Sequence, residues 1–121
     1  MTKIQNPKQY DLEERTLVFA KRVRGFIKNL PKTAGNFEDG KQVIRSSGSI
    51  GANYIEANES LSKKDFVMRI KICRKEAKET EYWLCLLDAN ENLELETERK
   101  RLVQESIELR KIFGSILEKS Q

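Results

Sequence analysis

One segment decides the fold of this chain: SKKDFVMRIKICRKEAKETEYWLCLLDA, residues 62–89. It opens with Ser62 and has the acidic Asp65 three positions later, which resembles a capping box at a helix N-terminus. At about 100° per residue, its apolar residues form two stripes on nearly opposite faces of a helix. The first stripe consists of Phe66, Ile70, Cys73, Ala77, Thr80, Leu84 and Leu87, and the second of Met68, Ile72, Trp83 and Leu86. The segment therefore predicts one long helix over about residues 63–89.

The second stripe is the unusual feature, because a bundle core uses only one face of each helix. A helix that is apolar on two faces either packs on both sides within its own chain or offers the second face to another subunit. We favour self-association, since each helix of a four-helix bundle keeps an outer face. Glu79 lies in this stripe one turn after Lys75, so an ion pair between subunits is one interpretation and an ordinary exposed pair is the other. The predicted oligomer interface comprises Met68, Ile72, Glu79, Trp83 and Leu86.

Three further helices are predicted, over about residues 11–29, 38–58 and 97–118. The first ends where Pro31 disfavours helical geometry in the residue before it, and an acidic connector at 93–96 precedes the last. The apolar stripe of the first helix is Leu12, Thr16, Phe19, Val23, Phe26 and Leu30, and that of the last is Leu102, Ser106, Leu109, Phe113 and Ile116. A chain of 121 residues suits a single domain, here residues 1–121. The prediction is an all-α fold, an antiparallel up-down four-helix bundle.

The helix over 38–58 has an unusual middle, SSGSIGAN at residues 46–53. Each Gly or Ser in a helix interior costs a few tenths to about 1 kcal/mol relative to Ala. We expect the close approach of another helix backbone to offset this loss. A Gly-rich phosphate cradle is the alternative, but no strand precedes the segment and no Gly-Lys-Ser/Thr ends it.

The composition restricts the chemistry, because the chain has no histidine. This removes histidine acid–base catalysis, Ser-His and Cys-His pairs, and most zinc and iron sites. Cys73 and Cys85 lie about 18 Å apart on one predicted helix, too far for a disulfide between them, and both are expected to be buried thiols. Nothing in the spacing of the carboxylates requires a cleft. We therefore expect no enzymatic activity, no catalytic residues, no metal and no cofactor.

Neither export nor membrane insertion is indicated. The first residues contain no apolar signal-peptide core, and no window approaches about 18 uncharged apolar residues. We expect a cytoplasmic protein with no membrane association.

Positive charge is concentrated near the N-terminus. Residues 1–45 hold ten lysines and arginines against five acidic residues, whereas residues 46–90 hold seven of each. Lys21, Arg24 and Lys28 share the face opposite the apolar stripe of their helix. Such a row can follow phosphates without reading sequence, although a solvated outer face is the alternative. The predicted nucleic-acid-binding residues are Lys21, Arg22, Arg24, Lys28, Lys32 and Arg45.

The short connection at residues 59–61 raises a second hypothesis for nucleic acid, a helix-turn-helix motif. Both flanking helices would run for about five turns, however, and the start of the would-be recognition helix offers only Lys63 and Lys64. We prefer an antiparallel helical hairpin.

Three stretches resemble one known family. They are SIGANYIEA at residues 49–57, KKDF at 63–66 and CRKEAKETEYWL at 73–84. Together they look like the bacterial four helix bundle protein family, also called 23S rRNA intervening-sequence proteins, and the likeness covers about residues 10–117. The chain departs from the family where Gly51 replaces a frequent proline and at Ala57-Asn58.

The resemblance implies an up-down four-helix bundle that assembles into a ring of five subunits. Some members are encoded inside insertions in large-subunit ribosomal RNA genes. A related accessory protein of diversity-generating retroelements is a basic pentameric barrel that binds nucleic acid and a reverse transcriptase. By matching position, Asn53, Glu56 and Glu79 carry over as recurrent polar residues. We interpret them as structural groups that hydrogen-bond within or between subunits.

The leading hypothesis is a non-enzymatic homo-oligomer that binds RNA or DNA non-specifically through the basic face of its first helix. Ribosomal RNA is one candidate partner. A ring would repeat the basic row in every subunit and so multiply its phosphate contacts. The competing hypothesis is a protein-interaction scaffold with no role in nucleic-acid binding.

Overall fold

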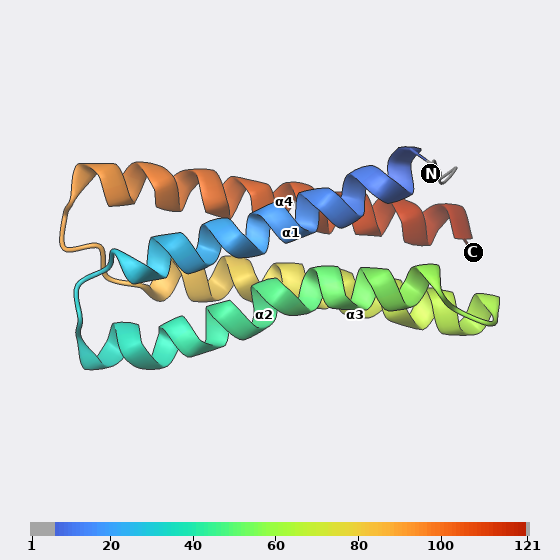
Figure 1. The fold of residues 1–121 in the computed structure, drawn as a ribbon, viewed down its shortest axis with the longest axis horizontal. Coiled ribbons are helices and arrows are strands. Elements are labelled where there is room, and N and C mark those ends of the chain that lie inside the picture. The colour runs from blue at the N-terminus through green and yellow to red at the C-terminus, as the bar shows by residue number, and fades with distance from the viewer. Residues whose placement is uncertain (1–6, 121) are drawn as a thin grey trace, which may run out of the picture.

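The structure is a computed structural model that describes residues 7–120. It contains four helices, α1 (Pro7–Lys28), α2 (Ala34–Asn58), α3 (Lys63–Leu86) and α4 (Leu93–Ser120), and the described residues include no strand. Successive helices run in opposite directions, which confirms the predicted up-down four-helix bundle (Figure 1). The link between α2 and α3 is a hairpin, as expected. Residues 1–6, which include Lys3 of the N-terminal charge excess, and residue 121 lie outside the described part.

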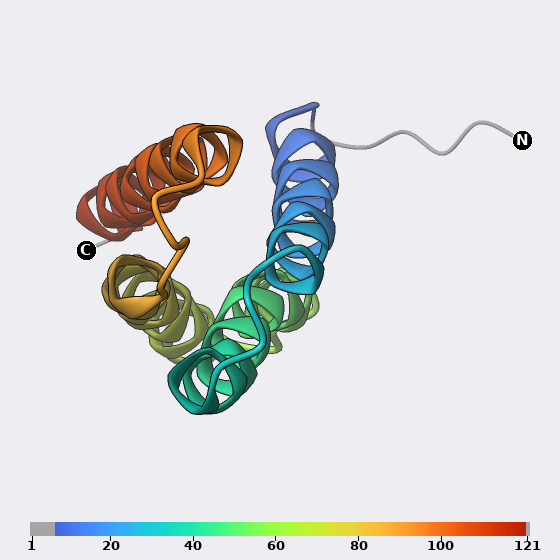
Figure 2. The same cartoon turned by 90° about the vertical axis from the view of Figure 1, so that its left-hand side faces the viewer.

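The helices surround one core in the order α1, α2, α3, α4 (Figure 2). α2 packs closely on both α1 and α3, and α3 on α4, whereas the contact between α1 and α4 is much sparser. The whole predicted stripe of α1 is buried. In α4 the stripe ends on Leu117, which is buried, while the predicted Ile116 is only partly buried against the core.

Four helix limits differ from the prediction by three residues or more, including the start of α1 at Pro7 rather than about residue 11, and two of the four have a local cause. The expected connector at 93–96 forms the first turn of α4, because the side chain of Asn92 accepts a hydrogen bond from the Leu95 amide and caps the helix. α2 begins at Ala34, since Thr33 caps the Asn36 amide in the same way. α3 ends at Leu86 rather than residue 89. At its start, Ser62 accepts from the Asp65 amide, which confirms the predicted N-cap.

The Gly/Ser-rich middle of α2 allows close helix packing, as predicted. A Cβ added at Gly51 would lie 2.8 Å from Thr16 Oγ1 and 3.1 Å from Thr16 Cβ on α1. On the neighbouring face, the hydroxyls of Ser46 and Thr80 lie 2.8 Å apart in a hydrogen bond between α2 and α3. Small residues therefore bring α2 against both of its neighbours, which offsets their low helix propensity.

Two polar side chains, neither expected from the sequence, tie the turns at one end of the bundle. The buried Asn36 amide donates to the carbonyls of Pro31 and Asp88, and its Oδ1 accepts from the Asp88 amide. Arg99 of α4 donates to the carbonyls of Leu84 and Leu87 at 2.6 and 2.5 Å. Both residues satisfy backbone groups that the helix ends leave unpaired.

Candidate nucleic-acid and subunit interfaces

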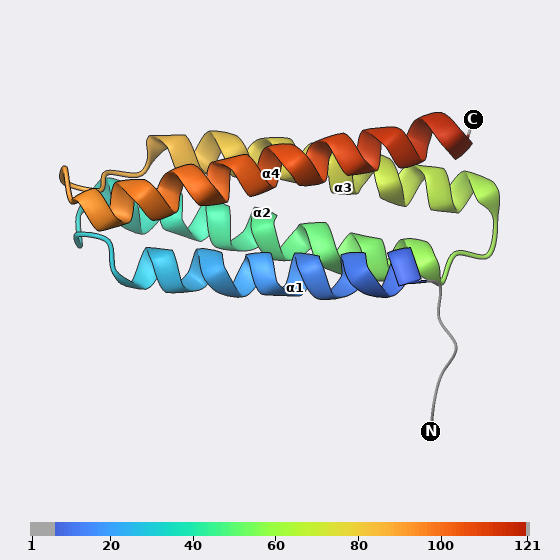
Figure 3. The ribbon, with the colours of Figure 1, turned by 90° about the horizontal axis from the view of Figure 1, so that it is seen from above.

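The basic row of α1 lies on the outer surface of the bundle. Lys21, Arg24 and Lys28 are exposed and lie three and four residues apart, as their spacing predicts. The helix that carries them, α1, runs along one edge of the bundle (Figure 3). The Arg24 guanidinium lies over Gly48 of α2, and it donates to the Ala20 carbonyl at 3.4 Å. Among the described residues, no acidic side chain forms an ion pair with Lys21, Arg24 or Lys28.

Two other predicted nucleic-acid residues already have acidic partners. Arg22 donates through Nε and Nη2 to the carboxylate of Glu98 on α4, at 3.2 to 3.3 Å. Nη2 of Arg45 lies 3.8 Å from the carboxylate of Glu79 on α3. Their charges are therefore partly compensated within the chain. Arg15 forms a similar bridge from α1 to Glu105 of α4, with N–O distances of 2.6 and 3.0 Å.

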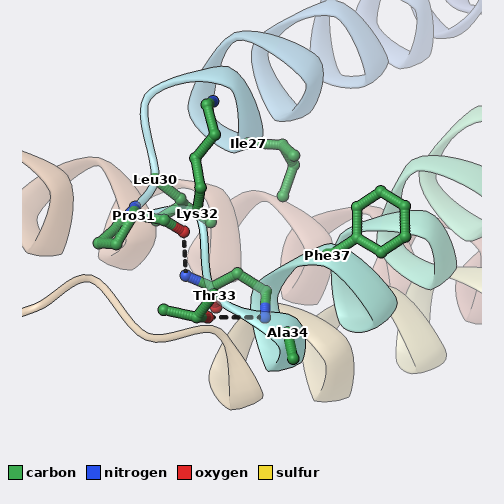
Figure 4. A pocket seen from close by; sticks show the side chains of 8 residues that line it. Ile27, Leu30, Pro31, Lys32, Thr33, Ala34 and Phe37 are labelled. Carbon is green, nitrogen blue, oxygen red and sulfur yellow. Dashed lines mark hydrogen bonds between the residues drawn. The ribbon is translucent and has the colours of Figure 1, made fainter.

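Lys32 stands apart from the row, in the turn between α1 and α2. It is exposed and extends out from the turn, beside an open hollow of about 440 Å³ (Figure 4). The hollow is mainly apolar and includes Ile27 and the exposed Phe37. The Lys41 ammonium lies 4.3 Å from the centre of the Phe37 ring. Lys32 therefore adds an exposed cation beyond the C-terminal end of α1.

The second stripe of α3 lies at the surface. Met68 and Leu86 remain 46% and 48% exposed, and Ile72 and Trp83 are half-buried. Tyr82, which the stripe did not include, is 60% exposed and packs edge-on against Trp83, with ring centroids 5.2 Å apart. Within residues 12–120, Met68, Tyr82 and Leu86 stay largely uncovered by other parts of the chain, whereas Trp83 packs partly against the core. The structure therefore brings an apolar ridge to the outer face of α3.

The charged groups within this ridge are arranged differently from the predicted Lys75–Glu79 pair. The Glu79 carboxylate faces Arg45 of α2, and the Lys75 ammonium lies 3.9 Å from Glu76 Oε2. The packing of α2 against α3 brings Arg45 close to Glu79. The spacing of residues along one helix could not predict this contact between two helices.

Glu76 is a buried carboxylate with an unsatisfied oxygen. Its Oε1 has no hydrogen-bond donor among the described residues, and only 6% of the residue is exposed. Burial raises the pKa of this carboxyl and the nearby Glu79 raises it further, against the opposing effect of Arg45 and Lys75. Buried polar groups normally have partners, so Glu76 marks a place where a donor is missing. Sequence spacing gave no signal for it.

Of the two remaining polar candidates, one is held within the chain. Asn53 donates to the Ser49 carbonyl and hydroxyl, at 2.9 and 3.0 Å, and accepts from Arg69 Nη1 of α3 at 3.0 Å. Asn53 therefore links α2 to α3, in keeping with a structural role. The Glu56 side chain is exposed on the surface of α2.

The reactive and ligating groups of the described chain are sparse. Cys73 is buried, donates to the Ile50 carbonyl, and has a pKa raised to about 12 by burial. Cys85 is exposed, contrary to the expectation that both thiols are buried. Between residues 7 and 120, no cluster of three or more cysteine or acidic side chains could hold a metal ion, and no helix has a run long and apolar enough to cross a bilayer.

The model of the 23S rRNA-intervening sequence protein family matches residues 8–115. The chain belongs to this family. A solved structure of a protein of unknown function from the S23 ribosomal protein family of Bacteroides thetaiotaomicron has 36% sequence identity and a TM-score of 0.78. The match covers 92% of the present chain and 98% of that protein. No curated protein matches the chain. Membership of the 23S rRNA-intervening sequence protein family confirms the resemblance in helices α2 and α3.

Proposed function

We propose that this 23S rRNA-intervening sequence protein is a non-enzymatic homo-oligomer, a ring of five subunits, that binds RNA or DNA through the outer face of α1. One observation carries the proposal: Lys21, Arg24 and Lys28 form an exposed row in which, among the described residues, no acidic side chain pairs with them. Lys32 adds a further exposed cation in the turn after α1.

The dimensions of the row suit a phosphate backbone. Lys21 and Lys28 lie about 10 Å apart along the helix axis, which is about three phosphate spacings of one strand in a duplex. Lysine and arginine contact phosphates as charges and hydrogen-bond donors, so the row would bind with little dependence on sequence. Arg22 and Arg45 would contribute less, because Glu98 and Glu79 already compensate their charges.

Two observations support self-association. The ridge of Met68, Trp83 and Leu86 leaves apolar surface on α3 that a second copy would remove from water. Tyr82, which is 60% exposed and packs against Trp83, extends this apolar surface. Repetition of the α1 row around a ring would then raise avidity for a long polyanion.

Exposed aromatic surface also favours the second candidate, a protein-interaction scaffold. Tyr82 and Trp83 form an edge-on pair, and both residue types are enriched at protein interfaces. On this reading, the ridge contacts a different protein and the basic face only keeps the chain soluble.

Two experiments separate these functions. Sedimentation of the wild type beside Trp83→Glu tests assembly: we expect an oligomer that the variant disrupts, and a monomer in both would contradict the ridge argument. Filter binding to RNA and DNA at about 50 mM salt tests the α1 face, and binding that falls as salt rises is expected. A protein partner retained in a pull-down after nuclease treatment, together with no binding to nucleic acid, would favour the scaffold instead.

A further inference from the structure

A second basic surface lies on the opposite side of the bundle from α1. Lys64, Lys71, Arg74 and Lys78 of α3 are all exposed, and their spacings of seven, three and four residues place them on one helix face. Lys111 of α4 lies across from them, and α3 and α4 run side by side (Figures 2 and 3). Of the ion pairs in the described chain, none involves any of the five.

Charge counting along the chain conceals this surface, because residues 46–90 hold equal numbers of acidic and basic residues. In the folded chain, the acidic and basic side chains of this segment lie in different places. Glu79 faces Arg45 of α2, Glu81 lies 3.6 Å from Arg110 of α4, and Glu76 is buried. Glu79 and Glu81 thus lie in the seams with α2 and α4 and are compensated there, and the buried Glu76 is removed from the surface, whereas the lysines remain outside. Asp65, the remaining acid of α3, lies partly exposed in its first turn. The segment of α3 itself holds seven basic and four acidic residues, so the balanced count over residues 46–90 hides a positive helix, and folding places much of its charge on one face.

The surface is hollowed where the cations converge. Lys71, Arg74 and Lys111 line a shallow hollow of about 350 Å³ between α3 and α4. Gly114 and Ser115 also line it, so a small side chain, a hydroxyl and a bare backbone leave room for an oxyanion. Leu117 and the carboxylate-bearing Glu118 complete the lining. A second hollow adjoins it through Lys71 and is lined by Lys63, Lys64, Val67 and Met68.

We infer that this α3–α4 surface, defined by Lys64, Lys71, Arg74, Lys78 and Lys111, is a second contact for the phosphate backbone of RNA or DNA. The inference rests on the proposed function, because it adds a surface for the same ligand. Lys64 and Lys78 lie about 21 Å apart along the helix axis, or about six phosphate spacings of one strand, twice the length of the α1 row. A strand that contacts both surfaces must pass from one side of a bundle to the other, or between neighbouring copies.

A polyanionic strand fits this surface better than an anionic membrane does. Membrane-surface helices carry large apolar side chains beside their basic face. On α3, Met68 and Leu86 are exposed near the basic residues, but they belong to the ridge that the proposed self-association would cover. Among the described residues of α4, Leu93 is the only exposed large apolar side chain, and it lies at the first residue of the helix, far from Lys111. The hollow itself is lined mainly by cationic and small polar residues.

Three charge-neutralised variants of the full chain test the inference. The first carries Lys71→Gln, Arg74→Gln and Lys111→Gln; the second carries Lys21→Gln, Arg24→Gln and Lys28→Gln. The matched control carries Lys100→Gln, Arg101→Gln and Lys119→Gln, which removes the same charge from exposed positions outside both surfaces. Fluorescence anisotropy with a labelled single-stranded RNA would be measured across a salt series, and thermal denaturation would verify that each variant folds.

We expect the α3–α4 variant to bind about tenfold or more weakly than the wild type at about 50 mM salt, and its log–log salt slope to be smaller by about two. The control should differ from the wild type by less than about threefold. Equal loss in the control would overturn the inference, because net charge alone would then explain the effect. Wild-type affinity in the α3–α4 variant, with weak binding in the α1 variant, would overturn the inference but leave the proposed function standing.

Two further outcomes complete the test. Weak binding in the α3–α4 variant and wild-type binding in the α1 variant would support the inference and contradict the role of the α1 face. Flotation of the wild type and the α3–α4 variant with vesicles of anionic phospholipid tests the membrane alternative. If only the wild type floats, and the variant keeps its RNA affinity, the surface binds membranes and the inference is wrong.

Discussion

The guanidinium of Arg45 on α2 lies 3.8 Å from the carboxylate of Glu79 on α3. Arg45 is a proposed nucleic-acid-binding residue and Glu79 is a proposed subunit-interface residue, so both proposed roles depend on this contact. Both side chains are more than one third exposed, and such a pair stabilises the fold by no more than about 1 kcal/mol. Its main consequence is electrostatic: Glu79 compensates a charge that would otherwise add to the basic surface.

Glu79→Gln should therefore strengthen binding to RNA. Removal of the carboxylate releases the Arg45 charge, and we expect about a two- to fivefold gain in affinity at low salt that disappears as salt rises. Anisotropy titration would measure it. Glu59→Gln removes an exposed carboxylate at the end of α2 and serves as the control. An equal gain in both variants would mean that net charge, rather than this pair, sets the affinity.

Lys21 and Arg22 are adjacent in sequence but should respond differently to alanine. Lys21→Ala should weaken RNA binding and leave the unfolding free energy unchanged, since the side chain is exposed and unpaired within the described residues. Arg22→Ala should lower the unfolding free energy by up to about 1 kcal/mol, because it breaks the bridge to Glu98 that spans the sparse α1–α4 contact. Urea denaturation and RNA titration of both variants would check this. Equal losses of affinity would show that Glu98 does not compensate Arg22.

Gly51→Ala should destabilise the bundle by about 1 to 3 kcal/mol. The added Cβ would lie 2.8 Å from Thr16 Oγ1, and the helices must separate to accept it. Gly25→Ala is the matched control on α1, where no atom lies within 4 Å of the new methyl group and helix propensity alone should stabilise by about 0.5 to 1 kcal/mol. Stabilisation by both substitutions in thermal or urea unfolding would refute the close packing at Gly51.

The stripes of apolar residues are the part of the fold that sequence predicts best. Every stripe residue of α1 is buried, and the first stripe of α3 is buried from Ile70 to Leu87. The predicted ends of the helices were less accurate. Capping side chains such as Asn92 and Thr33 decide where a helix begins, and the spacing of apolar and charged residues does not reveal which residue is the cap. The clamp of Asn36 on Asp88 joins turns that are 52 residues apart, and no local pattern encodes it.

Glu76→Gln should stabilise the protein at neutral pH and change its pH dependence. Burial, together with Glu79, raises the pKa of Glu76 above its ordinary value of 4.5, against Arg45 and Lys75. The folded state thus holds this proton to higher pH than the unfolded chain, so the carboxyl lowers stability as pH rises from about 4.5. We expect a gain of about 1 to 2 kcal/mol near pH 7 and little gain near pH 4. Urea denaturation at both pH values would measure it.

Glu59→Gln, at an exposed position, should leave that pH dependence unchanged. If Glu76→Gln instead destabilises the protein near neutral pH, the carboxylate has a donor in the assembled protein. Sedimentation at the same concentrations would then reveal whether the substitution also dissociates the oligomer.

The candidate surfaces were only partly predictable. The α1 row follows from local spacing, because Lys21, Arg24 and Lys28 share one face of a single helix. On α3, the spacing of Lys64, Lys71, Arg74 and Lys78 likewise gives one face, but the addition of Lys111 and the pairing of Glu81 with Arg110 of α4 do not follow from spacing. Compensation between helices decides which charges remain available, and it requires the tertiary packing.

The salt dependence of RNA binding by the wild-type protein tests the central claim most directly. Three phosphate contacts by the α1 row predict that log Kd rises linearly with log salt, with a slope of at least about 2, starting from measurable affinity at about 50 mM salt. The Lys21→Gln, Arg24→Gln, Lys28→Gln variant should lose most of that slope. Absence of binding at low salt, or an affinity that does not change with salt, would contradict the proposal that this bundle binds nucleic acid through α1.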